Sequence, residues 1–301
     1  MPSTTQAAPQ LLSQKPPTRG LKSLVRSRPV LAYVVLTFLI SWGGVLLFVA
    51  FGPGRFPIPA EEFDPLIPYA LLITVAGPAL AGPLLAGLVD GRSGLRELRS
   101  RLIRWRVAAR WYTVGLLGAP LAVMAVLLPL SMISTEFLPA IITTDAKAGL
   151  LLGGLAAGVA AGILEELGWT GFAVPRLLAR HGVLRAGLLL GVVWGVWHFL
   201  VYAAGSGTPS GGLAWDVFLP PVAFFIAVLP VFRVLMIWVY DRTESLPLAM
   251  LMHGSLSATA PVILAPEVTG AGLAAFYLAL GGLMWLVVAA VGMANRRQPA
   301  T

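Results

Sequence analysis

Long apolar stretches constrain the fold of this chain more than any other feature. Eight such runs follow one another along the 301 residues, at about 30–51, 66–89, 111–133, 148–172, 186–203, 217–240, 246–264 and 270–293. Most of them approach or exceed the roughly 20 residues that a helix needs to cross a bilayer. Within lipid, every backbone N–H and C=O group must form its hydrogen bond inside the protein. Apolar runs of this length meet that requirement by forming helices. The sequence therefore predicts an all-α fold, a polytopic membrane helical bundle with about eight transmembrane helices.

The composition excludes a soluble domain and several kinds of chemistry. Hydrophobic residues make up 57% of the chain and charged residues only 11%, whereas a soluble domain carries about 25% charged residues. The chain has no cysteine, so disulfides, thiolate metal sites and a cysteine nucleophile are excluded. Any chemistry at a site in this protein must therefore use oxygen and nitrogen atoms.

Basic residues lie in alternate connecting segments. They occur before the first apolar run, between the second and third, after the fourth, after the sixth and at the end of the chain, while the other connections carry mostly acidic residues. The positive-inside rule then places both termini in the cytoplasm. We interpret the formal net charge of +8 as a topology signal and expect no nucleic-acid partner. Richness in Ala, Leu, Gly and Arg is typical of a GC-rich bacterium, so we expect a multi-pass protein of the bacterial inner cell membrane.

The chain is predicted to hold one membrane domain between two short tails. Residues 1–25 are rich in Pro, Ser, Thr and Gln without an apolar period, which is typical of a disordered tail. The membrane domain is expected over 26–295 and a second cytoplasmic tail over 296–301. Nothing in the pattern indicates a separate soluble domain.

Two segments of the membrane domain depart from a plain transmembrane helix. The segment 90–110 predicts a basic helix at the membrane interface, with Leu95, Leu98, Leu102 and Trp105 on its apolar face. The sixth run, by contrast, is interrupted by prolines and one arginine, namely Pro220, Pro221, Pro230 and Arg233. We expect this sixth span to be kinked or partly buried among other helices.

Two glutamates and two histidines fall within the apolar runs and are candidates for a functional site. Glu165 and Glu166 stand side by side near the end of the fourth run, and His198 and His253 lie in the fifth and seventh. An ionised side chain in hydrocarbon costs roughly 2.5 kcal/mol or more, so such residues are functional candidates by default.

Chain geometry allows these residues to meet. We expect Pro175 to end the fourth helix near Phe172, which places Glu165 about 10 Å inside the cytoplasmic boundary at about 1.5 Å per residue. The same arithmetic places His253 about 10 Å and His198 about 18 Å inside. The sequence therefore predicts one cytoplasm-facing pocket.

Two mechanisms fit a glutamate, two histidines and a serine. In the first, Glu165 and His198 hold a water that Glu165 deprotonates, while His253 and Ser257 donate hydrogen bonds to the oxyanion of a peptide carbonyl. In the second, Glu165, His198 and His253 bind a zinc-like divalent metal with one position open for water. Residue types alone do not choose between them, because a general base and a metal ligand use the same groups.

The motif order EELGWTG, WGVWH and MHGSLSA resembles the intramembrane endopeptidases called CPBP or Abi proteins, which include CAAX prenyl proteases and bacteriocin-processing proteins. The family motifs are E-E-x-x-x-R, F-x-x-x-H and H-x-x-x-N, and the family-like core covers about 111–265. The resemblance implies that Glu165 is the catalytic glutamate and Glu166 its partner. It also implies that His198 and His253 are the two motif histidines.

Three motif positions depart from the family pattern. Trp194 replaces the phenylalanine and keeps an aromatic wall, Thr170 replaces the arginine, and Ser257 replaces the asparagine. Loss of the arginine removes the cation expected beside Glu166, although Arg176 could reach back if the chain bends. Ser257 can still donate a hydrogen bond but is shorter than asparagine. If the oxyanion donor is lost, the rate falls on the order of 10²- to 10³-fold.

Three functions remain open at the level of the sequence. The first is an endopeptidase that cleaves a membrane-associated peptide or membrane protein near the cytoplasmic leaflet, with the lipid bilayer as its partner. The second is an inactive family member that serves as a membrane scaffold or bacteriocin-immunity factor. The third is a proton-coupled transporter, since buried acids and histidines also relay protons.

Overall fold

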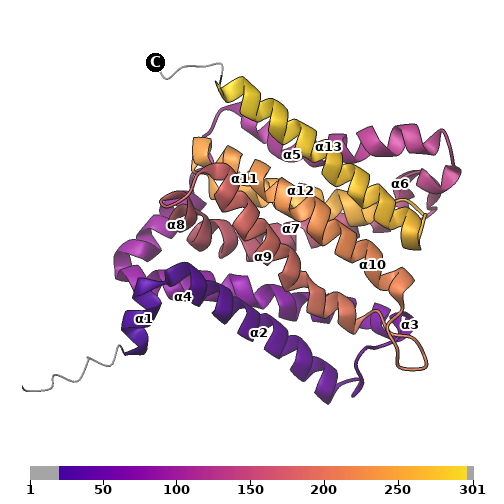
Figure 1. The fold of residues 1–301 in the computed structure, drawn as a ribbon, viewed down its shortest axis with the longest axis horizontal. Coiled ribbons are helices and arrows are strands. Elements are labelled where there is room, and N and C mark those ends of the chain that lie inside the picture. Colours follow the sequence, from indigo (N-terminus) through magenta and orange to yellow (C-terminus); the bar gives the residue numbers. More distant parts are fainter. Residues whose placement is uncertain (1–19, 297–301) are drawn as a thin grey trace, which may run out of the picture.

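The computed structural model describes residues 20–296, which are helical apart from turns, loops and three isolated β-bridges (Figure 1). Eight helical segments in this range are long and apolar enough to cross a membrane, which confirms the predicted all-helical, eight-span bundle. These spans are Pro29–Phe51, Ala60–Leu102, Ala109–Ser131, Lys147–Leu178, Val183–Ala204, Trp215–Thr243, Leu246–Ile263 and Gly270–Ala294.

Several spans consist of more than one helical element. The α-helices are α1 (Leu21–Ser27), α2 (Pro29–Phe51), α3 (Ala60–Phe63), α4 (Ile67–Leu102), α5 (Ala109–Ser131), α6 (Ala140–Thr143), α7 (Lys147–Glu166), α8 (Val174–Leu178), α9 (Val183–Ala204), α10 (Trp215–Ala223), α11 (Leu229–Thr243), α12 (Leu246–Ala258) and α13 (Gly270–Arg296). Short π-helices continue three of them: η3 (Trp169–Ala173), η4 (Phe224–Val228) and η5 (Thr259–Ile263). Two 3₁₀-helices, η1 (Asp64–Leu66) and η2 (Thr135–Phe137), lie in connections.

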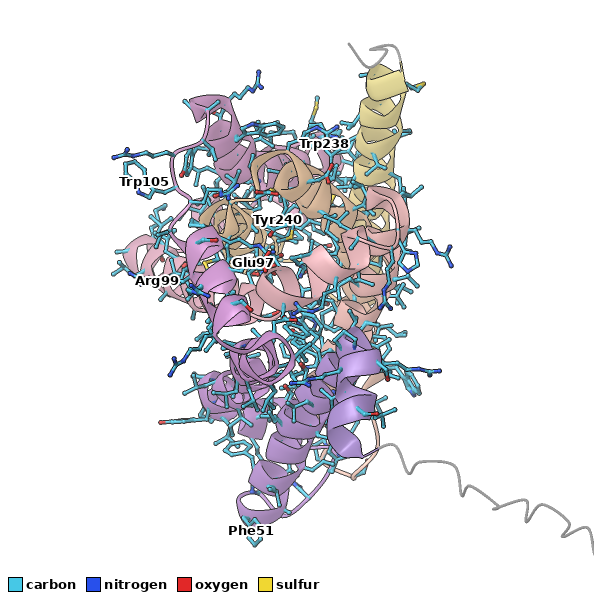
Figure 2. All side chains as sticks on the ribbon, turned by 90° about the vertical axis from the view of Figure 1, so that its left-hand side faces the viewer. Phe51, Glu97, Arg99, Trp105, Trp238 and Tyr240 are labelled. Carbon is cyan, nitrogen blue, oxygen red and sulfur yellow. The ribbon has the colours of Figure 1, made fainter. Side chains whose placement is uncertain are left out.

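The connecting segments gather at two ends of the bundle. We call the end that holds residues 90–110, 174–185 and 241–246 the basic end, where Arg104 pairs with Glu244 and Arg176 with Asp90. We call the other end, with α3, α6 and the start of α10, the acidic end. In Figure 1 the basic end lies on the left, near the label of α8. Figure 2 turns that side toward the viewer and labels Glu97, Arg99, Trp105, Trp238 and Tyr240 there.

The sixth and seventh spans form the interior of the bundle. Within their most apolar windows 67% and 56% of the residues are buried, compared with 22% for the first span. In the sixth span the Pro220–Pro221 pair is followed by η4, and Pro230 begins α11 where its missing N–H costs little. The sequence predicts a span that is kinked or partly buried, and its burial confirms the second of these.

Glycines bring the helices around the site close together. A Cβ on Gly162 of α7 would lie 2.4 Å from the carbonyl oxygen of Met250 of α12, and one on Gly158 would lie 2.4 Å from that of Gly254. On α9, a Cβ on Gly195 would lie 2.4 Å from the carbonyl oxygen of Phe225. Small residues at these positions let the backbones approach, as is common in membrane helix pairs.

The basic segment after the second span differs from the prediction. Gly91 has a φ of 67° and breaks α4 into two helical parts, and the second part ends at Leu102. Trp105 therefore lies in the connection to α5 and not on the expected helix, because the chain leaves helical geometry after Leu102. Leu98 is buried against Gly171 of η3, while Leu95 and Leu102 are exposed.

Two boundary predictions are also wrong. The fourth helix does not end near Phe172, because η3 continues into α8 and Pro175 lies in the first turn of α8, where proline is tolerated. Residues 21–25 belong to α1 and are not part of a disordered tail. The rest of the predicted N-terminal tail, residues 1–19, and residues 297–301 of the C-terminal tail lie outside the described residues.

Candidate active site

Three helices bring the predicted site residues together. Glu165 comes from the end of α7, His198 from α9, and His253 and Ser257 from one face of α12. These four side chains line one cavity of about 780 Å³. Glu165 is 3% exposed and His253 is 1% exposed. The predicted convergence of the motif residues in one pocket is therefore present in the structure.

Glu166 lies behind the cavity wall at the centre of a buried network. Nη1 of Arg233, on α11, donates to both carboxylate oxygens of Glu166 at 3.0 and 2.9 Å. Nδ1 of His253 lies 2.7 Å from Oε1, and the hydroxyl of Thr170 donates to Oε2. Glu166 and Arg233 are both 0% exposed. A buried charge is tolerated when it is paired and hydrogen-bonded in this way.

The sequence prediction that Glu166 lacks a cation is wrong. Arg233 supplies the guanidinium from a different helix, while Thr170, at the expected arginine position, contributes a hydroxyl. Arg176 does not reach back to Glu166, because its guanidinium pairs with Asp90 and donates to the carbonyl of Phe172. The available signal was Arg233 itself, since an arginine within an apolar span is a functional candidate by default.

Thr170 lies in the π-helix η3, four residues after Glu166. Backbone N–H groups of both Phe172 and Ala173 donate to the carbonyl of Gly168, so the helical register shifts within η3. Gly168 also fits against other helices, since a Cβ there would lie 2.4 Å from the carbonyl oxygen of Pro78. Single-turn π-helices of this kind frequently occur at functional sites.

Trp194 contacts Glu165, His198, Arg233 and His253. Its indole N–H donates to Oε2 of Glu165 at 2.8 Å, and its carbonyl lies 2.8 Å from Nδ1 of His198. The guanidinium carbon of Arg233 lies 3.9 Å from the centroid of the indole, and the ring of His253 meets it edge-on at 4.9 Å. The family phenylalanine would keep the aromatic contacts but could not donate to Glu165.

The partners of the two histidines assign their tautomers. Nδ1 of His198 faces a carbonyl and Nδ1 of His253 faces a carboxylate, so each Nδ1 carries a proton and donates. Nε2 is then the nitrogen with a lone pair in the neutral ring. Nε2 of His253 lies 3.8 Å from Oε1 of Glu165, the carboxylate oxygen that Trp194 does not bind.

The cavity extends toward the acidic end of the bundle. Apart from the site, its walls are apolar and include Ile67 at the start of α4, Gly153 in the first half of α7, and Val262 in η5. All three residues lie toward the acidic end of their spans. On the basic side of the site the helices pack closely, where Leu98 meets Gly171. Whether the cavity faces the cytoplasm stays a prediction, because it depends on the orientation of the bundle in the membrane.

The donor types at the site would suit a zinc-like ion, but their spacing does not. Within residues 20–296 no three His, Asp or Glu side chains lie close enough together to hold a metal ion. Glu165, His198 and His253 share the cavity without forming such a group, so the steps proposed below use only the protein's own groups. Metal binding by these three residues stays a prediction.

Ser257 lies on the cavity wall one helical turn from His253 and is partly buried. Its hydroxyl makes no hydrogen bond to another group among the described residues, in contrast to Ser255, which donates to the carbonyl of Leu116. Ser257 is therefore placed to donate to a molecule in the cavity, as the sequence predicts.

Fold and site together define a multi-pass helical membrane protein with a buried Glu/His site. Residues 147–259 match the family model described as Type II CAAX prenyl endopeptidase Rce1-like. CAAX prenyl protease 2 of Methanococcus maripaludis is 29% identical over 98 residues. That match covers 31% of this chain and 34% of the relative, so the chain matches about a third of the relative's length. Both matches support the resemblance of this segment to the CPBP family, and they suggest a membrane protease of the CAAX type.

Proposed function

We propose that the protein is an intramembrane endopeptidase that hydrolyses a peptide bond of a membrane-associated peptide or membrane protein. The observation that carries this proposal is the convergence of Glu165, His198, His253 and Ser257 on one cavity inside the bundle. The match to a CAAX endopeptidase family over the segment that holds all four residues supports it.

In the proposed reaction Glu165 is the general base. Trp194 holds one of its carboxylate oxygens, which leaves Oε1 to take a proton from a water that Nε2 of His198 helps to hold. The resulting hydroxide adds to the peptide carbonyl, the C–N bond breaks, and Glu165 returns the proton to the leaving amine. Ser257, and His253 in its protonated form, donate hydrogen bonds to the oxyanion.

Glu166 has a positioning role in this proposal. Both of its carboxylate oxygens are occupied by Arg233, His253 and Thr170, so it has no access to a substrate. Its contact with Nδ1 of His253 orients the ring so that Nε2 points to Glu165, in the same way that a carboxylate orients a catalytic histidine elsewhere.

The depth of the site and the charge of the loops support cleavage near the cytoplasmic leaflet. His253 is seven residues from Leu246 at the basic end, which corresponds to about 10 Å of helix. Positive-inside places the basic end in the cytoplasm. The substrate is then a peptide or a membrane protein that enters the cavity from the bilayer. Location in the inner membrane of a bacterium stays a prediction.

The test compares wild-type protein with Glu165→Gln, which keeps the size of the side chain and removes the base. Both proteins are reconstituted in liposomes with a library of peptides that carry one membrane-embedded end. We expect the wild type to cleave and the variant to be slower by about 10²- to 10⁴-fold. Equal cleavage by both proteins contradicts the role of Glu165 as the base. No cleavage by either contradicts the endopeptidase proposal and leaves the inactive scaffold or immunity factor.

The same liposomes test the two remaining alternatives. A proton flux that disappears in Glu165→Gln indicates the proton-coupled transporter. Elemental analysis of the purified protein tests the metal prediction, because a bound divalent metal should be lost in His198→Ala. We expect neither flux nor metal dependence if Glu165 acts as proposed.

A further inference from the structure

A second pocket lies at the basic end, apart from the candidate active site. It has a volume of about 600 Å³ and is lined by Arg110, Trp111 and Val114 of α5 and by Trp238 and Arg242 of α11. It shares no lining residue with the cavity that holds Glu165. Trp238 is labelled on this face in Figure 2.

Two arginines frame the pocket, and each lies over an indole. The guanidinium carbon of Arg242 is 4.4 Å from the ring centroid of Trp238, and that of Arg110 is 5.5 Å from the centroid of Trp111. The two indoles meet edge-on, with centroids 5.4 Å apart. The pair of rings therefore holds two guanidinium groups beside one opening.

The charge of the pocket is positive. Arg110 has no ion pair within the described residues, and both arginines are exposed. Arg242 donates to the carbonyl of Trp238, and its one carboxylate neighbour is the half-exposed Asp241, at 3.9 Å. A pair at that distance on the surface contributes little. Guanidinium groups bind phosphate oxygens well because their N–H groups form a planar fork.

The polarity of the pocket changes with depth in the bundle. Arg110 lies in the first turn of α5 and Val114 one turn further in, while Arg242 lies in the last turn of α11 and Trp238 one turn further in. One helical turn is about 5.4 Å. The cationic groups therefore lie at the boundary of the bundle and the apolar walls lie deeper. A phospholipid has the same arrangement, with a phosphate at the interface and apolar chains below it, whereas a free phosphate has no apolar part.

We propose that this pocket binds the phosphodiester headgroup of an anionic phospholipid. Its phosphate lies between Arg110 and Arg242, and its glycerol and upper acyl chain lie on Trp111, Trp238 and Val114. Basic side chains near a membrane surface contribute about 1 kcal/mol each toward anionic lipid. Tryptophan is enriched at the level of the lipid headgroups in membrane proteins.

The experiment measures lipid binding to the full-length protein in detergent by native mass spectrometry. The probes are phosphatidylglycerol and phosphatidylcholine. We compare wild type with Arg110→Gln/Arg242→Gln and with a matched control, Arg92→Gln/Arg96→Gln, which removes two exposed charges from the same end. We expect at least fivefold weaker phosphatidylglycerol binding in the first variant, less than a twofold change in the control, and no effect of either on phosphatidylcholine.

Three outcomes would overturn the proposal. Equal weakening of phosphatidylglycerol binding in the control shows that the basic end attracts anionic lipid without a specific binding site. Equal binding of both lipids shows that the pocket does not distinguish an anionic from a zwitterionic headgroup. Inorganic phosphate that displaces phosphatidylglycerol at millimolar concentration shows a site for a soluble anion. If the double variant is unstable, Arg110→Gln alone is used, because Arg110 makes no ion pair within the described residues. We expect Arg110→Gln to weaken phosphatidylglycerol binding. An unchanged affinity in this variant also contradicts the proposal.

Discussion

At the scale of single residues, Trp194 shows how one substitution in a motif can change the role of a position. The family motif has phenylalanine there, and the sequence alone indicates only that an aromatic wall is kept. In the structure the indole N–H donates to Glu165, while the ring packs under Arg233 and against His253. The extra nitrogen fixes the carboxylate that we propose as the base.

Replacing Trp194 by phenylalanine isolates this hydrogen bond. Trp194→Phe keeps the ring contacts and removes the donor to Glu165, so we expect a kcat/KM about tenfold lower, as for a hydrogen bond to a charged group worth about 1.5 kcal/mol. Peptide cleavage in liposomes measures it. Trp197→Phe is the matched control, because the buried indole N–H of Trp197 has no acceptor within the described residues. A similar loss in both variants would show that only packing matters.

The Arg233–Glu166 pair can be tested by moving the cation. Arg233→Met leaves a buried carboxylate without its guanidinium, so we expect a loss of about 3–5 kcal/mol in stability, measured by thermal unfolding in detergent. Arg233→Lys keeps a charge and should be intermediate. Arg233→Met/Thr170→Arg returns an arginine to the family position and should recover part of the loss. Equal stability of the Lys and Met variants would contradict the ion pair as the reason for Arg233.

At the scale of elements, closely packed helix pairs hold the site. The pair α7 and α12 carries Glu165, Glu166, His253 and Ser257, and α9 and α11 carry His198 and Arg233. Glycines at both contacts allow the backbones to approach. The site geometry therefore depends on residues that touch no reacting group.

Gly158 tests this dependence. A Cβ there would lie 2.4 Å from the backbone oxygen of Gly254, which cannot move without shifting α12. We expect Gly158→Ala to cost about 1–3 kcal/mol, as overpacking does, and to lower cleavage by displacing His253. Gly149→Ala on the same helix is the control, because a Cβ at Gly149 has nothing within 4 Å. If thermal unfolding and peptide cleavage change equally little in both variants, the contact between Gly158 and Gly254 does not have this role.

At the scale of the whole molecule, the bundle separates basic from acidic connections. The structure brings the basic segments to one end, as the alternating charges indicate. Which end faces the cytoplasm is a prediction of the positive-inside rule.

The absence of cysteine allows a direct test of orientation. We expect Glu61→Cys, at the acidic end, to react with a membrane-impermeant maleimide added to intact cells, and Arg106→Cys, at the basic end, to react only after the membrane is opened. Both positions are exposed, and the chain has no other cysteine to react. The reverse pattern of labelling would invert the topology and place the candidate site near the other leaflet.

The sequence by itself determined the helical membrane class, the eight spans and the motif residues Glu165, His198 and His253, because hydrophobicity and intramembrane charge are local properties of the chain. Only the tertiary structure decided that Arg233 pairs with Glu166, that Trp194 donates to Glu165 and that the cavity extends toward the acidic end. The physical reason is distance along the chain. Arg233 and Glu166 are 67 residues apart, and no local pattern records which faces of α7, α9, α11 and α12 meet.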